Sequence, residues 1–205
     1  MDLAFTDEQQ FLREAIRGAV DREAALPTVR RWVLDADPPQ HGEALALAVR
    51  QGWTGIGIEE HRGGQGGDLV ELAILAEELG RGAVPADGLY ATVLAATALA
   101  AVDGDGAGPL IEAFAEGEQV GALLHPGGKP ADAGPCGLSA PLMLGASEAH
   151  KLIAWNGEAL EVHDAARAER TTRVLVDRTR SLADVTAGDA PLHRFGDVGR
   201  EAMTP

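Results

Sequence analysis

The chain has 205 residues, which is enough for one large domain or two small ones with a sizeable core. Its formal net charge of -15 argues against nucleic acid and anionic membranes as partners, because both require a basic patch. Cys136 is the only cysteine and no apolar run is long enough for a signal peptide or a membrane span, so we expect a cytoplasmic protein without an internal disulfide.

The first half of the sequence has the pattern of a helical domain. Thr6 and Gln9 have capping-box spacing, which predicts the start of a first helix. Apolar residues then recur at helical spacing from Leu12 to Val20. Pro27 allows a second short helix that carries Trp32. Further helices are predicted over residues 43–51, 69–79, 89–102 and 110–116.

The glycine run at 63–67 leads directly into the helix predicted over 69–79. We interpret the run as a tight turn and not as a phosphate loop, because it lacks the Lys-Ser/Thr pair of such loops. Asp68 and Glu71 fit the capping positions of the helix, and their charges would repel an anion there. The helix is apolar around most of its circumference, which predicts that it is the buried centre of the helical domain.

The pattern changes near residue 120. A strand is predicted over 120–124, followed by a Gly/Pro-rich loop. Asn156-Gly157 between two apolar runs is typical of a hairpin with a type I′ turn. Further short strands are predicted over 172–177 and 181–185. The order indicates an α+β fold, with an all-α helical domain over 1–119 followed by a small antiparallel β-domain over 120–205.

Several stretches resemble the acyl-CoA dehydrogenase family. FTDEQQFLREAIRGAV (5–20) is similar to the first helix of that family, and GWTGIGIEEHRGGQGGDLVELAILAEELGR (52–81) to its N-terminal signature. LMLGASEAHKLIAW (142–155) and VDRTRSLADV (176–185) resemble the middle β-domain of divergent, actinobacterial-type members. The family fold has a third, C-terminal four-helix domain, and we expect this chain to comprise the first two domains without it.

The resemblance implies flavin-dependent α,β-dehydrogenation of an acyl-CoA thioester, with FAD as cofactor. In that reaction a glutamate removes the α-proton while the β-hydrogen leaves as hydride to the flavin. The glutamate lies in the C-terminal domain of the family, and no residue of this chain matches it, so no catalytic residue is assigned. We therefore expect the chain to be inactive alone and to need a partner chain that supplies the base.

The flavin-binding loop of the family, with the pattern Thr-Glu-Pro-x-Ala-Gly-Ser, corresponds here to residues 124–130. By this resemblance Leu124, His125 and Gly127 are the candidate cofactor-binding residues. Leu124 replaces the threonine and His125 the glutamate, so the hydroxyl groups are missing, although the backbone N–H of Leu124 remains. Trp155 precedes the Asn-Gly turn and is interpreted as a sheet-face residue.

Tyr90, Leu94 and Thr97 share one face of a predicted helix, in the region that lines the acyl pocket of the family. They are the candidate substrate-binding residues, and helix-to-helix packing is the alternative that the helical pattern itself favours. The six histidines show no metal-ligand spacing, so no metal site is predicted.

The leading hypothesis is an acyl-CoA dehydrogenase-like protein that binds an acyl-CoA thioester. Apolar surface left by the missing domain predicts a homodimer or a hetero-complex with another acyl-CoA dehydrogenase-like chain. Two alternatives remain open. One is a non-catalytic acyl-CoA-binding or interaction module, and the other is a truncated fragment of a longer enzyme.

Overall fold

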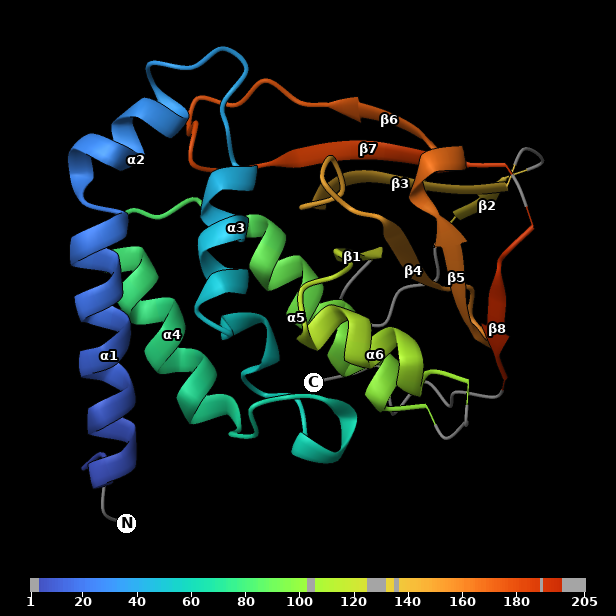
Figure 1. The fold of residues 1–205 in the computed structure, drawn as a ribbon. Helices are drawn as coiled ribbons and strands as arrows, with labels where there is room; N and C mark the ends of the chain where they lie inside the picture. Colours follow the sequence, from blue (N-terminus) through green and yellow to red (C-terminus); the bar gives the residue numbers. More distant parts are fainter. Residues whose placement is uncertain (1–3, 103–105, 125–131, 135–136, 189, 197–205) are drawn as a thin grey trace.

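The computed structural model describes residues 4–102, 106–124, 132–134, 137–188 and 190–196, and within them helices precede two β-sheets (Figure 1). The predicted α+β fold is confirmed. The helices are α1 (Asp7–Glu23), α2 (Leu26–Val33), α3 (Gly42–Arg50), α4 (Leu69–Arg81), α5 (Asp87–Ala100) and α6 (Gly108–Ala115), with short 3-10 helices η1 (Trp53–Gly55), η2 (Glu60–Arg62) and η3 (Ala165–Arg167).

Two helices start at the capping boxes that the sequence predicts. At α1 the backbone N–H of Gln9 donates to the Thr6 hydroxyl over 3.2 Å, and the Gln9 side chain accepts from the Thr6 N–H over 3.1 Å. At α4 the Asp68 carboxylate accepts from the N–H of Val70, while Glu71 accepts from the N–H of Asp68, both over 2.8 Å. Each box satisfies backbone donors that have no partner inside the helix.

The central helix of the fold is α5, and the prediction that α4 takes this place is wrong. Leu69, at the start of α4, is 81% exposed, and the buried residues of α4 lie on one side of the helix. Figure 1 shows α4 beside α1 at one edge of the molecule, with α5 between the helices and the sheets. Helix α5 is the more apolar of the two helices. Its small side chains also allow other elements to approach it from several sides.

A buried carboxylate joins α1 to α4. Glu78 is fully buried and accepts hydrogen bonds from Arg17 over 2.6 Å and from Arg13 over 3.1 Å, both on α1. Arg81, on α4 itself, donates to the same carboxylate over 2.9 Å. These bonds, with that of Arg17 the strongest, hold the pKa of Glu78 at about 2 against the effect of burial.

Each of the two sheets has four strands in the described residues. One sheet has the order β1-β4-β5-β8, with β1 (Gly121–Leu124), β4 (Lys151–Trp155), β5 (Leu160–Asp164) and β8 (His193–Phe195). The other has the order β2-β3-β7-β6, with β2 (Asp132–Gly134), β3 (Gly137–Leu144), β7 (Leu182–Ala187) and β6 (Glu169–Thr172). The strand pairs are antiparallel, as predicted, except that β1 and β4 are parallel. The chain passes through the second sheet between these two strands, and such a crossover makes parallel pairing possible.

The predicted strands of the β-domain are partly displaced. The predicted strand at 172–177 is replaced by β6, which ends at Thr172, and the strand at 181–185 corresponds to β7. Strands β3 and β8 were not predicted from the sequence, and β2 lies within the stretch that was predicted as a Gly/Pro-rich loop. The hairpin of β4 and β5 is confirmed, with Trp155 paired to Leu160.

The turn of this hairpin differs from the predicted type I′ turn. Four residues, Asn156 to Ala159, connect the strands, and of them only Gly157 has a positive φ, of 103°. The Asn156 side chain accepts from the N–H groups of Glu158 and Ala159, each over 2.9 Å. A type I′ turn needs positive φ at both central residues. Here the asparagine side chain organises the loop, so its backbone stays in the ordinary region.

The buried residues form three clusters that correspond to three layers of the fold. The first lies among α1 to α5 and the second between α5, α6 and the outer face of the first sheet. Trp155 is buried in this second cluster, which confirms it as a sheet-face residue. The third cluster lies between the two sheets and joins Leu124, Leu138 and Val185.

No helix of the described residues has both the length and the apolar character needed to cross a membrane.

We predict opposite effects for two glycine-to-alanine substitutions. A Cβ atom on Gly121 in β1 would lie 2.7 Å from Ala95 Cβ and 2.8 Å from the Phe114 ring, so Gly121→Ala should destabilise the fold by about 1–3 kcal/mol. A Cβ atom on Gly80 in α4 would meet nothing within 4 Å, so Gly80→Ala should stabilise it by about 0.5–1 kcal/mol. Urea unfolding of both variants measures the two values, and equal effects would contradict the packing described.

A second prediction concerns Glu78. Replacing it with glutamine at pH 7 should cost about 2–4 kcal/mol of stability, because Arg13 and Arg17 lose their shared buried partner. The stabilisation that Glu78 provides is full above its unfolded pKa of 4.5 and is lost as the pH falls towards 2. The difference between wild type and variant, measured by urea unfolding, should therefore shrink below pH 4.5. Glu77→Gln is the control, because Glu77 is exposed and pairs with Arg13.

Candidate functional site

The predicted substrate-binding residues lie along one open side of α5. Tyr90, Leu94 and Thr97 are spaced at i, i+4 and i+7, which places them on the same face. Tyr90 is half-buried against the helical core, whereas Leu94 is 43% exposed and Thr97 is also exposed. Burial raises the pKa of the Tyr90 phenol, so it remains neutral at physiological pH. The face combines apolar surface with a phenol and a hydroxyl group.

The threonine hydroxyl groups of α5 are already bonded within the protein. Thr97 donates to the carbonyl of Val93 over 2.9 Å, and Thr92 donates to the carbonyl of Gly88 over 2.7 Å. Thr92 also accepts from the N–H of Gly121 at the start of β1, over 3.3 Å. Helix α5 therefore contacts the strand that leads into the predicted flavin loop.

The predicted flavin residues are described only at their first member. Leu124 ends β1, and its fully buried side chain packs between the two sheets. Its backbone lies in register with Ala154 of β4. The side chain of Leu124 is therefore not available to a cofactor. His125 and Gly127 lie outside the described residues, so their predicted role is untested.

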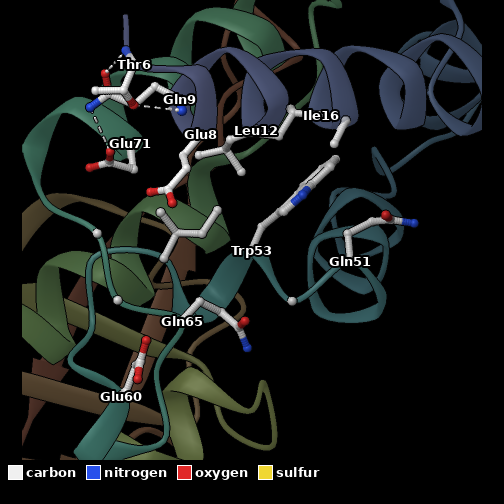
Figure 2. A pocket seen from close by; sticks show the side chains of 15 residues that line it. Thr6, Glu8, Gln9, Leu12, Ile16, Gln51, Trp53, Glu60, Gln65 and Glu71 are labelled. Atoms are coloured by element: carbon white, nitrogen blue, oxygen red, sulfur yellow. Dashed lines mark hydrogen bonds between the residues drawn. The ribbon is translucent and has the colours of Figure 1, made fainter.

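A cavity of about 530 Å³ lies elsewhere, in the helical domain between α1, the segment 51–56 and the turn before α4. Figure 2 shows the Trp53 side chain between Leu12 and Ile16 of α1 on one side and the glycine-rich turn on the other. From the sequence, the glycine run predicts only a tight turn. The Gly-Trp pair and the glycine run border the cavity together, but their spacing alone does not reveal it.

The cavity has an acidic rim. Glu8, Glu60 and Glu71 line it, together with the amides of Gln9 and Gln65, and no basic residue is among the described lining. The N–H of Asp68 and then the Gln9 amide bind the Glu71 carboxylate and lower its pKa to about 2, so it is ionised at neutral pH. Phosphate groups would be repelled here. The cavity therefore does not suit the nucleotide part of a CoA thioester.

Leu142 in β3 is an outlier that the sequence did not reveal. Its φ of 56° lies in the left-handed region, at a register shift between Ala140 and Met143. The Asp184 carboxylate accepts from its N–H over 3.0 Å, and Arg173 pairs with the same carboxylate. The strained backbone leaves the Leu142 side chain exposed on the β-domain.

Among the described residues, no group of His, Cys, Asp and Glu is arranged to hold a metal ion.

Comparison with known proteins decides the family. The family model described as the acyl-CoA dehydrogenase N-terminal domain matches residues 6–119, which is more than half of the chain. The chain belongs to the acyl-CoA dehydrogenase family. Curated relatives agree with this assignment. Acyl-CoA dehydrogenase IpdE2 of Mycolicibacterium smegmatis is 29% identical over 184 residues, and IpdE2 of Mycobacterium tuberculosis is 37% identical over 120 residues.

Solved acyl-CoA dehydrogenase structures share the fold. Glutaryl-coenzyme A dehydrogenase in complex with glutaryl-CoA has a TM-score of 0.78 at 20% identity, and the match covers 98% of this chain and 60% of that one. The ChsE4-ChsE5 complex of Mycobacterium tuberculosis has a TM-score of 0.76 at 19% identity, covering 97% and 59%. At this level of identity the likeness establishes the fold alone.

The chain spans about half the length of the curated relatives. The match to the M. smegmatis protein covers 89% of this chain and 53% of that protein, and the match to the M. tuberculosis protein covers 58% and 36%. The helical and β-domains of an acyl-CoA dehydrogenase are therefore present, and the described residues carry no counterpart of the four-helix domain.

Proposed function

We propose that this chain supplies the helical and β-domains of a flavin-dependent acyl-CoA dehydrogenase, and that a partner chain supplies the catalytic base. The observation that carries the proposal is the open face of α5. This helix is buried along most of its length, yet Leu94 and Thr97 are exposed. An apolar face left open on a central helix can hold an acyl chain. A second protein chain that covers this face would close the site.

Exposed apolar residues of the β-domain support a partner chain. Val174 and Val176 are fully exposed after β6, and Leu142 is exposed on β3 of the same sheet. Exposed apolar groups of this kind mark interfaces when they gather on one surface. Two of the solved structures with this fold are of assemblies named for two chains, ChsE4-ChsE5 and the Tcur3481-Tcur3483 steroid ACAD. These assemblies support a hetero-complex.

The described residues give little support for binding of FAD by this chain alone. The flavin would accept the hydride in the proposed reaction. The side chain of Leu124 faces the core between the sheets and offers no donor. We therefore assign no step of the reaction to flavin contacts of this chain, and we propose that FAD binds at the junction with the partner chain.

A non-catalytic acyl-CoA-binding module is the second candidate function. The burial of Leu124 favours it, because a chain whose Leu124 side chain faces the core could still hold a thioester on α5. Calorimetry of the chain mixed with each candidate partner, with FAD and with acyl-CoA thioesters as titrants, separates the two candidates. If the thioester binds and FAD does not, with each candidate acyl-CoA dehydrogenase-like partner in turn, the result favours the non-catalytic module.

We predict that co-expression with a matching acyl-CoA dehydrogenase-like partner, sought first among adjacent genes, yields a yellow complex. The complex should reduce an electron-acceptor dye with an acyl-CoA thioester, and the isolated chain should not, because no counterpart of the base is found among the described residues. Flavin absorbance and dye reduction are the measurements. A colourless, inactive mixture with every candidate partner would overturn the proposal.

We also predict that Leu94→Asp weakens thioester binding by about tenfold or more, because an unpaired carboxylate would face the acyl chain. Calorimetry of the complex measures the change. Leu69→Asp is the control, since Leu69 is an exposed leucine at the start of α4, away from the α5 face, and its substitution should leave affinity unchanged. Equal affinities in wild type and Leu94→Asp would show that this face is not the acyl site.

A further inference from the structure

The cavity between α1 and the glycine-rich turn has the size of a ligand site, and it takes no part in the function proposed above. Its volume of about 530 Å³ lies within the range of pockets that enclose a ligand. Leu12 and Ile16 of α1, together with Ile56, form an apolar wall beside Trp53. The cavity therefore offers apolar surface for a hydrocarbon chain next to the carboxylates of its rim.

Two carboxylates of this cavity lack a partner within the part of the chain that the structure describes. Glu8, in the first turn of α1, and Glu60, at the start of η2, form no ion pair or hydrogen bond with these residues. The next residue along, Glu59, pairs instead with Arg62 over 3.3 Å. With the ionised Glu71, carboxylates from three elements line one cavity. Like charges repel one another there, and a bound cation removes that repulsion.

The indole N–H of Trp53 is an independent sign of a ligand. The residue lines the cavity and is 5% exposed, and its N–H has no hydrogen-bond partner among the described residues. Figure 2 shows the ring projecting from the segment 51–56 towards Leu12 and Ile16. The nitrogen is not sealed from solvent, unlike that of Trp155, so it opens on the cavity that Trp53 lines. A buried indole N–H usually donates to an acceptor, which here has to belong to the ligand.

The side-chain amide of Gln65 adds a neutral group that can donate and accept. It lies exposed at the cavity and has no hydrogen-bond partner in the described ranges. The amide of Gln9 is already used, since it donates to Glu71 over 2.9 Å and accepts from the N–H of Thr6. An amide is the natural partner of a peptide group. The cavity thus presents partners for carbonyl groups and for cations, and a basic peptide segment carries both.

We propose that this cavity binds a Lys- or Arg-bearing segment of the partner chain. A main-chain carbonyl of the segment accepts from the Trp53 N–H. The alkyl stem of the basic side chain lies along Leu12 and Ile16, and its charged end pairs with Glu8 and Glu60. A polyamine or a metal ion would meet the carboxylates but bring no acceptor for the indole. The inference rests on the proposed function, because it presupposes a partner chain.

The first test titrates the whole chain with three probes and follows the indole N–H signals of its three tryptophans by NMR. The probes are the blocked peptide acetyl-Lys-Leu-Lys-amide, its neutral counterpart acetyl-Gln-Leu-Gln-amide, and spermidine, which has charge but no carbonyl group. The basic peptide should shift the Trp53 signal most, because it alone has both groups. Trp32 and Trp155 do not line the cavity, so their signals serve as internal controls. Equal shifts with all three probes, or none with the basic peptide, would overturn the proposal.

The second test removes the two unpartnered carboxylates together. The double variant Glu8→Gln/Glu60→Gln should weaken binding of the basic peptide by about tenfold, because two ion pairs are lost. The matched control is Glu43→Gln/Glu118→Gln, which removes the same charge from exposed positions outside the cavity lining and should bind as wild type does. Urea unfolding checks that both double variants are folded. Equal weakening in both would indicate general attraction to an acidic protein and contradict a site at the cavity.

The same double variants in the co-expressed complex separate this inference from the proposed function. Flavin absorbance and dye reduction report the function, whereas the Kd between the chains reports the cavity. The Kd should rise by about tenfold in Glu8→Gln/Glu60→Gln and stay at the wild-type value in the control. A yellow, active complex with an unchanged Kd would overturn the inference and leave the proposed function standing. A colourless mixture in which the peptide still shifts the Trp53 signal would overturn the function and support the peptide site.

Discussion

Helix α5 is the element on which the rest of the structure depends, because its side chains enter all three buried clusters. Leu89 lies in the helical core, Leu99 in the core beneath the first sheet and Ala91 in the core between the sheets. One helix can meet three layers only if its side chains are small where backbones approach. At two places the facing residue is a glycine whose Cβ would lie 2.7 Å from an alanine of α5, at Gly121 and Gly145. The packing leaves a single open face on this helix.

The local features of the helical domain could be predicted from the sequence, but its centre could not. Capping boxes depend on residues three positions apart, so Thr6 with Gln9 and Asp68 with Glu71 identify two helix starts without tertiary information. Burial depends on the partner elements. The apolar sequence of α4 suggests a core helix, yet Leu69 faces solvent, because only one side of α4 meets α1. The alanine-rich α5 differs less in hydrophobicity between its faces than α4 does, and more of its residues are buried.

In the β-domain the hairpin could be predicted from the sequence, but the direction in which the Leu124 side chain points could not. Asn156-Gly157 correctly predicts a reversal, and the loop then takes four residues because the Asn156 side chain caps its own backbone. Leu124 falls at the expected start of the flavin loop by family resemblance. Whether its side chain points to the cofactor or to the core depends on the pairing of β1 with β4, which lies 30 residues further along the chain. No local pattern encodes that pairing.

The arrangement of charge places a constraint on any thioester complex. With a net charge of -15, the chain uses arginines internally, at Glu78 between α1 and α4 and at Asp87 between the domains. The cavity of the helical domain is lined by carboxylates without a basic residue among its described lining. The phosphate groups of CoA need positively charged partners. Apolar contact of the acyl chain with Leu94 does not offset the repulsion between these phosphates and a carboxylate-lined surface. On this account the acyl chain is the part of the thioester that the described residues of this chain can hold. We propose that the charge that holds its nucleotide end comes from a second chain, and that the same chain brings the base.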